Sequence, residues 1–210
     1  SIIRDVIEIK SVKFEFREND IAYLKIIKFG ENTSKEFNDA VNQIISRKSK
    51  GIILDLRNNP GGLLDEAIKV AGKMLPKESV VVFEENSEGE KESLKTAGGD
   101  KLSGVPTVVL INEGSASASE ILAGALHDDQ DITLIGKKSF GKGTVQELIK
   151  LSGNSSVKIT VAKWLTPKGD YIMEKGISPD IEVDLNTDDY NNNRDPQLDK
   201  AMEVIKEKMK

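Results

Sequence analysis

The sequence predicts an α/β domain with a largely parallel sheet. Short apolar runs typical of buried strands alternate with segments in which apolar residues recur every three or four positions, as on one face of a helix. The clearest strand-then-helix pairs are residues 51–56 with 64–75 and residues 105–112 with 114–126. This repeated order favours a parallel sheet, because each connecting helix returns the chain to the same end of the sheet.

The other segments complete the expected order of elements. Alternating stretches at residues 6–16 and 21–29, joined by a polar turn, predict a hairpin. Thr33 or Ser34 then caps an amphipathic helix, and a short closing helix is expected around Leu198. Further short strands are expected at residues 79–83, 132–135, 157–165 and 171–173.

The composition excludes several classes of protein. The 210 residues carry 35 acidic and 30 basic side chains, a net charge of −5, without the basic excess of a dedicated nucleic-acid binder. There is no cysteine, which excludes a disulfide framework, thiol catalysis and a cysteine-ligated zinc site. No apolar run approaches the roughly 18 residues that a membrane-spanning helix needs. Charges interrupt the apolar residues at positions 1–9, so the start predicts a strand and lacks the layout of a signal peptide.

Three serines occur where a strand gives way to a helix. Ser115, Ser117 and Ser119 alternate with alanines at this junction. A helix N-terminus offers unpaired N–H groups and a partial positive charge, which suit a serine nucleophile and the oxyanion that it generates. Ser117-x-x-Glu120 also fits a capping box, so a purely structural explanation stays open.

The single histidine lies too far along the predicted helix to activate these serines. His127 follows Ser117 by ten positions and Ser119 by eight. At about 1.5 Å per residue this is roughly 12–15 Å along a continuous helix, which is beyond hydrogen-bonding reach. A histidine triad on these serines is therefore excluded if the helix is continuous, and His127 is interpreted as a helix-terminal or surface residue.

A lysine replaces histidine as the base when its ammonium is desolvated enough to lose a proton near neutral pH. Lys142 is the candidate, because it lies between Gly141 and Gly143 just after an apolar strand. The alternative is a solvated surface lysine, the usual state of this residue type. Residues 136–142 also approach a phosphate-binding loop, but Gly143 occupies the position of the required hydroxyl residue, so a nucleotide site is disfavoured.

Proline and glycine cluster in the turn after the strand at residues 51–56. The Pro-Gly-Gly sequence at residues 60–62 leaves backbone N–H groups bare and lets another backbone or a ligand approach closely. Half an oxyanion hole and an ordinary tight turn both fit this pattern. Asp55 and Arg57, alternate residues at the end of that strand, are placed to form a structural ion pair near the site.

Taken together, these segments resemble the carboxyl-terminal processing peptidases, also called tail-specific proteases, a family of serine peptidases. The matching segments occur in order, at residues 55–62, 114–121, 136–146, 166–169 and 176–181. The resemblance implies that Ser117 is the nucleophile, Lys142 its general base and Gln146 the residue that orients the lysine. If residues 142–146 made one helical turn, the lysine and the glutamine would share a face.

The resemblance also implies the rest of the catalytic apparatus. The oxyanion hole is expected from the backbone N–H groups of Ala118 and of Gly61 or Gly62. Asp128 matches an acidic position of the family motif, for which a structural role is expected. The implied chemistry is acyl transfer through an ester on the serine, with no metal and no organic cofactor.

The implied architecture is a crotonase/ClpP-like spiral β-β-α core with a small strand-rich subdomain near the termini. Residues 13–210 are expected to form the peptidase core, and residues 1–12 the exit strand of an upstream PDZ domain missing from this chain. The implied partners are proteins or peptides with an apolar C-terminus. The resemblance implies that the protein acts outside the cytoplasm, in the periplasm or cell envelope. No nucleic acid is expected as a partner, and the protein could form a homo-oligomer. The alternative, from a different class, is a non-catalytic binding module that holds apolar tails or lipids.

Overall fold

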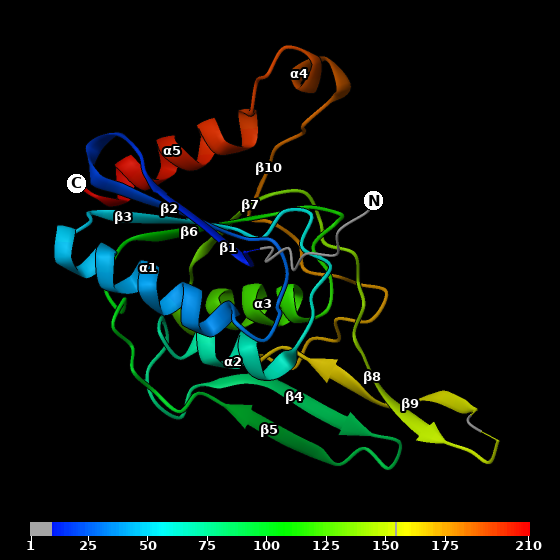
Figure 1. The fold of residues 1–210 in the computed structure, drawn as a ribbon. Helices are drawn as coiled ribbons and strands as arrows, with labels where there is room; N and C mark the ends of the chain where they lie inside the picture. Colours follow the sequence, from blue (N-terminus) through cyan, green and yellow to red (C-terminus); the bar gives the residue numbers. More distant parts are fainter. Residues whose placement is uncertain (1–9, 154) are drawn as a thin grey trace, which may run out of the picture.

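The computed structural model describes residues 10–153 and 155–210, and its centre is a six-stranded sheet (Figure 1). The strand order is β1-β2-β3-β6-β7-β10. These strands are β1 (Val12–Phe16), β2 (Ile21–Ile26), β3 (Gly51–Asp55), β6 (Thr107–Ile111), β7 (Thr133–Gly136) and β10 (Ile181–Glu182). Every neighbouring pair is parallel except β1 with β2. The predicted α/β domain with a largely parallel sheet is confirmed.

Helices cover both faces of this sheet. α1 (Thr33–Arg47), α2 (Leu64–Ala71) and α3 (Ala118–Gln130) lie on one face, and α5 (Pro196–Lys208) lies on the other (Figure 1). Since β2, β3, β6 and β7 follow one another across the sheet in chain order, the crossovers step in one direction and place their helices on the same face. This winding is the spiral core expected from the sequence. Among the described residues, no helix is both long and apolar enough to cross a membrane.

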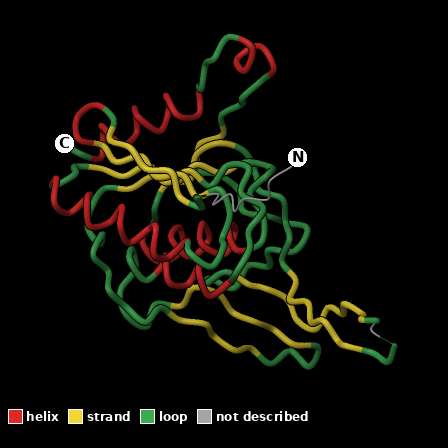
Figure 2. Tube along the Cα trace, in the orientation of Figure 1, coloured by secondary structure: helices red, strands yellow, loops and turns green. Residues whose placement is uncertain are grey.

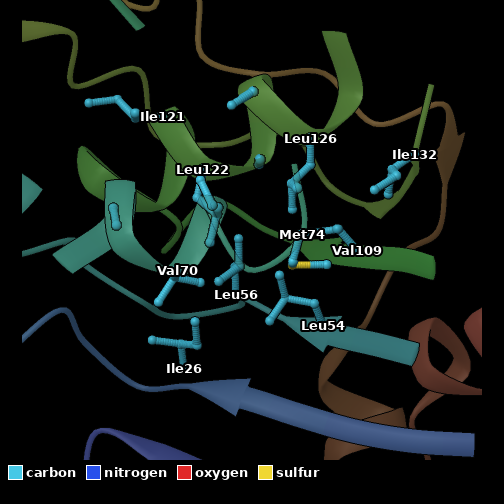
Figure 3. Packing of buried hydrophobic residues seen from close by; sticks show 14 of the residues in the cluster. Ile26, Leu54, Leu56, Val70, Met74, Val109, Ile121, Leu122, Leu126 and Ile132 are labelled. Carbon is cyan, nitrogen blue, oxygen red and sulfur yellow. The ribbon is translucent and has the colours of Figure 1, made fainter. Parts of the chain in front are cut away.

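The larger hydrophobic core lies between the main sheet and the helices α1 to α3. Leu54 and Leu56, at the end of β3, belong to one cluster with Leu122 and Leu126 of α3 and with Met74, which follows α2 (Figure 3). All five side chains are buried. Burial of a leucine side chain stabilises a fold by about 1.5–3 kcal/mol. The core therefore fixes α3 against the C-terminal end of β3.

A second cluster fills the opposite face of the sheet. Ile53 of β3 and Leu110 of β6 pack there with Ile205 of α5. A Cβ atom on Gly51 would lie 2.7 Å from the Ile205 Cγ1 atom, so only glycine allows α5 to approach β3 so closely. Because β3 is buried on both faces, its sequence is a continuous apolar run instead of an alternating one.

The second sheet is antiparallel, with the order β5-β4-β9-β8 (Figure 2). Its strands are β4 (Val80–Asn86), β5 (Lys91–Lys95), β8 (Thr144–Lys150) and β9 (Ser156–Leu165). β4 packs against the helical layer through Val81 and Val82. The strand-rich addition was expected near the termini, but the structure builds it from two segments in the middle of the chain.

The conditional expectation of a helical turn at residues 142–146 is wrong. β8 begins at Thr144, and Gln146 lies opposite Thr160 of β9. The aliphatic β-branched residues of this segment, such as Val145, favour a strand. Lys142 therefore precedes a strand, and Gln146 lies within it.

The predicted N-terminal hairpin is confirmed where the structure describes it. β1 pairs antiparallel with β2 across a short 3₁₀ turn at Glu18–Asp20. The described residues do not include positions 1–9. These positions hold the first part of the predicted hairpin, residues 6–9, and most of the predicted PDZ exit strand at residues 1–12. The domain boundary at residue 13 stays a prediction.

Two smaller expectations need correction. The N-cap of α1 is Asn32 and not Thr33 or Ser34; the Thr33 Oγ1 atom instead accepts the N–H of Gly30 at 2.9 Å. The predicted strand at residues 171–173 is reduced to a single bridge. α4 (Thr187–Asn191), a short helix in the polar segment before α5, was not expected at all.

A buried ion pair ties the C-terminal segment to the end of β3. Arg57 donates to both carboxylate oxygens of Asp55, from Nε at 3.0 Å and from Nη2 at 2.7 Å, which confirms the predicted pair. The same guanidinium reaches both oxygens of Asp195, at 2.7 and 2.9 Å, and the Oε1 atom of Gln197 at 3.0 Å. Asp55 also accepts the Tyr23 hydroxyl at 2.6 Å. Burial opposes the ionisation of Asp195, but the hydrogen bonds from Arg57 outweigh it and hold the pKa of Asp195 below its usual range.

We expect Asp195→Asn to lower the free energy of unfolding by about 1–2 kcal/mol at neutral pH, because it removes a charge-assisted pair at a partly exposed position. A carboxyl whose pKa is depressed by folding stabilises the protein above its unfolded pKa, and this contribution is lost as pH falls through the folded pKa. The difference between wild type and variant should therefore shrink below about pH 4.

Urea unfolding at a series of pH values measures this difference. Asp199→Asn, at an exposed position of α5, is the matched control and should change stability little at any pH. A constant difference between wild type and Asp195→Asn from pH 7 down to pH 3 would show that the ion pair does not contribute.

Candidate active site

The site lies where the turns after β3 and β6 meet. The two strands are parallel neighbours, so their carboxyl ends lie at the same edge of the sheet. The N–H of Ala116 donates to the Asn59 carbonyl at 2.9 Å, and the N–H of Asn58 donates to the Asn112 side chain at 2.8 Å. These bonds join the two turns directly.

The structure separates the three candidate serines. The Ser115 hydroxyl donates to the Leu56 carbonyl at 2.8 Å, and the Ser119 hydroxyl donates to the Asn59 carbonyl at 2.8 Å. Both serines are fully buried. Ser117 is partly exposed, and its hydroxyl donates to no acceptor among the described residues. Two of the serines therefore hold the turns together, and Ser117 alone is available to a substrate.

Ser117 has an unusual backbone conformation. It is the N-cap of α3, with φ 56° and ψ −119°. A positive φ at a non-glycine residue costs on the order of 1–3 kcal/mol and persists where the surroundings impose it, often at functional sites. Of the capping box predicted for Ser117 and Glu120, the bond from the Ser117 N–H to the Glu120 Oε2 atom is present at 2.8 Å, while the Ser117 side chain makes no cap hydrogen bond with a described residue.

The predicted oxyanion-hole residues lie beside Ser117. A Cβ atom on Gly61 would lie 2.8 Å from the Ser117 Cβ atom and 3.0 Å from the Ala118 nitrogen, and Gly61 has φ 92°, so glycine is required there. The N–H of Gly61 already donates to the Asn59 side chain at 2.9 Å. Within residues 10–153 and 155–210, the N–H groups of Gly62 and Ala118 have no acceptor. These two N–H groups are therefore unpaired among the described residues.

Asn59 is a residue of the site that the sequence did not single out. Its side chain is fully buried. The Nδ2 atom donates to the Ile26 carbonyl at 2.8 Å while Oδ1 accepts the Gly61 N–H. Asn59 thus orients the glycine turn from beneath. The sequence feature that could have identified Asn59 is its position two residues before the glycine pair at residues 61 and 62.

Backbone surrounds the loop that carries Lys142, as predicted from its two glycines. A Cβ atom on Gly143 would lie 2.3 Å from the Met173 nitrogen, and the Gly141 carbonyl accepts the Glu174 N–H at 2.9 Å. The Lys142 side chain itself is exposed. Its ammonium forms no hydrogen bond or ion pair with any described residue.

The predicted site residues are therefore brought together only in part. The structure places Gly61 beside Ser117 and Ala118, with Gly62 next to it in the chain. It holds the backbone of Lys142 near them but does not bond the ammonium to the Ser117 hydroxyl. Gln146 is exposed on β8. A strand and not a helix follows Lys142, so the helix N-terminus that a phosphate-binding loop requires is not there, which agrees with the rejection of a nucleotide site.

His127 has no contact with the serines. α3 is continuous over Ala118–Gln130, as the exclusion of a histidine triad required. The ring nitrogens of His127 lie 3.3 Å from Asp128 Oδ1 and 3.1 Å from Asp180 Oδ1. Asp128 Oδ2 accepts the Lys168 N–H at 2.9 Å, so this carboxylate holds the turn that follows β9, in keeping with its expected structural role.

No group of three or more histidine or acidic side chains is placed to hold a metal ion in the part of the chain that the structure describes. The polar groups at this turn are the Ser117 hydroxyl and backbone N–H donors, and the exposed Lys142 amine extends from the neighbouring loop. These are groups suited to acyl transfer.

A partly exposed serine at a strained strand-to-helix turn, beside unpaired N–H groups, is the arrangement of a serine-nucleophile hydrolase. Residues 20–183 match the profile described as peptidase family S41. The chain belongs to peptidase family S41.

The relatives agree with this membership. The carboxy-terminal processing protease CtpA of Bacillus subtilis (strain 168) is 44% identical over 185 residues, which cover 88% of this chain and 40% of that protein. The carboxyl-terminal-processing protease of a Synechocystis species is 47% identical over 164 residues, 78% of this chain and 38% of that protein. Among solved structures, a photosystem II D1 C-terminal processing protease superposes with a TM-score of 0.78 at 34% identity, over 85% of this chain and 49% of that one. The chain thus spans less than half the length of these relatives.

We expect Ser117→Gly to stabilise the fold relative to Ser117→Ala by about 1 kcal/mol, because glycine adopts a positive φ without strain and alanine does not. Guanidinium unfolding of the two variants measures the difference, and both lack the hydroxyl. Equal stabilities would mean that residue 117 does not hold a strained conformation in solution.

Proposed function

We propose that this chain is the peptidase core of a carboxyl-terminal processing serine endopeptidase, which cuts protein substrates near their C-termini. Ser117 is the nucleophile, Lys142 the general base and Gln146 the residue that orients the lysine. The observation that carries the proposal is the state of the three serines: two hydroxyls are committed to carbonyl groups and the third is free at a strained turn. Membership of family S41 and the names of the relatives support the same conclusion.

The proposed reaction proceeds through an acyl-enzyme. The neutral amine of Lys142 takes the proton from the Ser117 hydroxyl as Oγ attacks the scissile carbonyl. The N–H groups of Gly62 and Ala118 bind the oxyanion of the tetrahedral intermediate. Lys142 then gives the proton to the leaving amine, the C–N bond breaks, and a serine ester remains. Water, deprotonated by Lys142, attacks this ester. Lys142 then returns the proton to Ser117 Oγ as the C–O bond breaks and the new carboxyl terminus leaves.

The position of Gln146 on a strand is compatible with its proposed role. Gln146 lies two residues into β8 from Thr144, and Lys142 lies two residues before that strand, so we propose that the flexible side chains close the distance between them. Lys142 has a flexible four-carbon stem, which swings between solvent and Ser117. We propose that substrate binding covers the lysine and removes it from water, as its role as a base requires.

Two large apolar side chains are exposed on the segments that adjoin the Ser117 turn. Leu63, two residues after Gly61, is 48% exposed, and Phe140, two residues before Lys142, is 67% exposed. The N–H of Phe140 donates to the Ser115 carbonyl at 3.0 Å, which keeps this residue beside the nucleophile. Large exposed apolar groups on the segments next to a nucleophile favour a substrate with apolar residues around the scissile bond.

The remaining parts of the proposal rest on the resemblance and on the relatives' names. We propose that an upstream PDZ domain presents the substrate's tail, and that the protein acts outside the cytoplasm. The alternative is a binding module that holds apolar tails or lipids without cutting. It has no need of a free Ser117 hydroxyl and a basic residue together.

Cleavage of an unfolded protein with an apolar C-terminus tests the dyad. Ser117→Ala and Lys142→Ala should each lower kcat/KM by at least about a thousand-fold, because nucleophile and base act as one unit. Lys138→Ala, an exposed lysine four residues earlier in the same loop, is the matched control and should cut as the wild type does.

Cleavage by Ser117→Ala at the wild-type rate would contradict the assignment of Ser117 as the nucleophile. If the chain alone is silent, the same comparison is made with a PDZ domain fused before Ser1. Binding of the tail without cleavage in that fusion would favour the binding module.

Phe140→Ser should raise KM for substrates with apolar tails about tenfold, the loss of roughly 1.4 kcal/mol of apolar contact, and leave kcat nearly unchanged. Tyr190→Ser, which removes an aromatic side chain exposed on α4, is the control and should alter neither constant. Steady-state kinetics with apolar-tailed and polar-tailed peptides measure the effect. An equal rise in KM for both peptides would argue against an apolar contact.

A further inference from the structure

A single buried carboxylate joins the backbone of the proposed nucleophile to that of the proposed base. Glu120 lies in the first turn of α3 and is fully buried. Its Oε2 atom accepts the N–H of Ser117 at 2.8 Å and the N–H of Lys142 at 2.9 Å. Because both nitrogens lie within hydrogen-bonding distance of one oxygen atom, the two backbones are close neighbours.

The second oxygen of Glu120 is equally committed. Oε1 accepts the Ser139 hydroxyl and the Gly141 N–H, each at 2.6 Å. The Ser139 Oγ atom in turn accepts the N–H of Ile177 at 2.6 Å, so its own proton is directed at Glu120. Four donors therefore face a group with about four acceptor sites, which is the inventory of an ionised carboxylate.

This carboxylate accepts two of the four backbone N–H groups of residues 139–142, the segment that carries Lys142 and is called the lysine loop below. The loop has no regular secondary structure, yet each N–H from Ser139 to Lys142 has an acceptor. Ser139 donates to the Ile177 carbonyl and Phe140 to the Ser115 carbonyl, each at 3.0 Å. The N–H groups of Gly141 and Lys142 depend on Glu120 alone.

A helix cap does not account for this arrangement. A capping glutamate bonds the start of its own helix, as Glu120 does with Ser117. Three of its four donors come instead from residues 139–142, a segment that lies about twenty positions further along the chain. An ionised group held away from water is retained only when all its hydrogen-bonding sites are satisfied, as they are here.

We propose that Glu120 is a positioning residue that sets the location of Lys142 relative to Ser117. The inference rests on the proposed Ser117–Lys142 function. Glu120 does not touch the reacting atoms; it fixes the two backbones from which the reacting side chains extend. A displacement of about 1 Å between reacting groups costs on the order of a hundred-fold in rate, so the tie should be visible in kcat.

Glu120→Gln tests the proposal, because the amide keeps the shape of the side chain but replaces one acceptor oxygen by a donor that faces two N–H or O–H groups. We expect kcat to fall about a hundred-fold while KM changes less than two- or threefold. Glu66→Gln is the matched control. Glu66 is also buried in the first turn of a helix and accepts a backbone N–H, that of Ser34 at 2.7 Å, but it has no bond to the lysine loop. Its kcat should stay at the wild-type value.

Backbone amide NMR gives a readout that does not need activity. The resonances of Ser117, Gly141 and Lys142 should move in Glu120→Gln and stay in place in Glu66→Gln. Unmoved resonances in Glu120→Gln, or moved resonances with wild-type kcat, would overturn the proposal. If wild type and Glu66→Gln both fail to cleave even with a PDZ domain fused before Ser1, the proposed function fails, and the NMR comparison alone decides whether Glu120 ties the two segments.

A second variant covers the case in which Glu120→Gln does not fold. Ser139→Ala removes one of the four donors and leaves the carboxylate in place. We expect a fall in kcat of about tenfold with KM unchanged, together with a shift of the Gly141 resonance. Wild-type kcat and an unshifted Gly141 amide in a folded Ser139→Ala protein would count against the positioning role.

Discussion

The architecture of the site depends on the contact between the turns that follow β3 and β6. Parallel strands end at the same edge of a sheet, so these turns meet without any long connection. Close contact between the two turns requires small residues. It also requires hydrogen-bond donors for the buried carbonyl groups of both turns, because their irregular backbone lacks the bonds of a helix or sheet. Ser115 and Ser119 supply the donors to the carbonyls of Leu56 and Asn59. The serine between them is left at the surface of the contact, with the strained backbone that the contact imposes.

Features that depend on near neighbours were predictable from the sequence. Apolar periodicity predicted the helices on the main sheet and all its strands except the two-residue β10, because burial on one or both faces decides that pattern. Asp55 and Arg57 are two residues apart on an extended chain, so their pairing follows from strand geometry. The exclusion of His127 needed only the rise of a helix. The serine–alanine alternation placed Ser117 at the junction, although not its positive φ.

Features that depend on distant segments were not predictable. The sequence suggests only a local capping role for Glu120, because no neighbouring residue indicates that three hydrogen-bond donors from residues 139–142 bind its carboxylate. The partners of Arg57 at Asp195 and Gln197 are separated from it by 138 and 140 residues. The four-residue spacing between Lys142 and Gln146 is compatible with a helical turn and with one face of a strand, and only the pairing with β9 decides between them.

The long separation between Arg57 and Asp195 has a consequence for synthesis of the chain on the ribosome. The glycine turn begins directly after Arg57, whose guanidinium receives its last acidic partner from the segment before α5. Domains emerge N-terminus first, and contacts of high sequence separation close late. While the growing chain is short of Asp195, β3 and its turn lack this clamp and the covering helix α5 on the opposite face. The turn that carries Gly61 and Gly62 is therefore fully clamped only after residue 195 has left the ribosome and α5 has packed on the sheet.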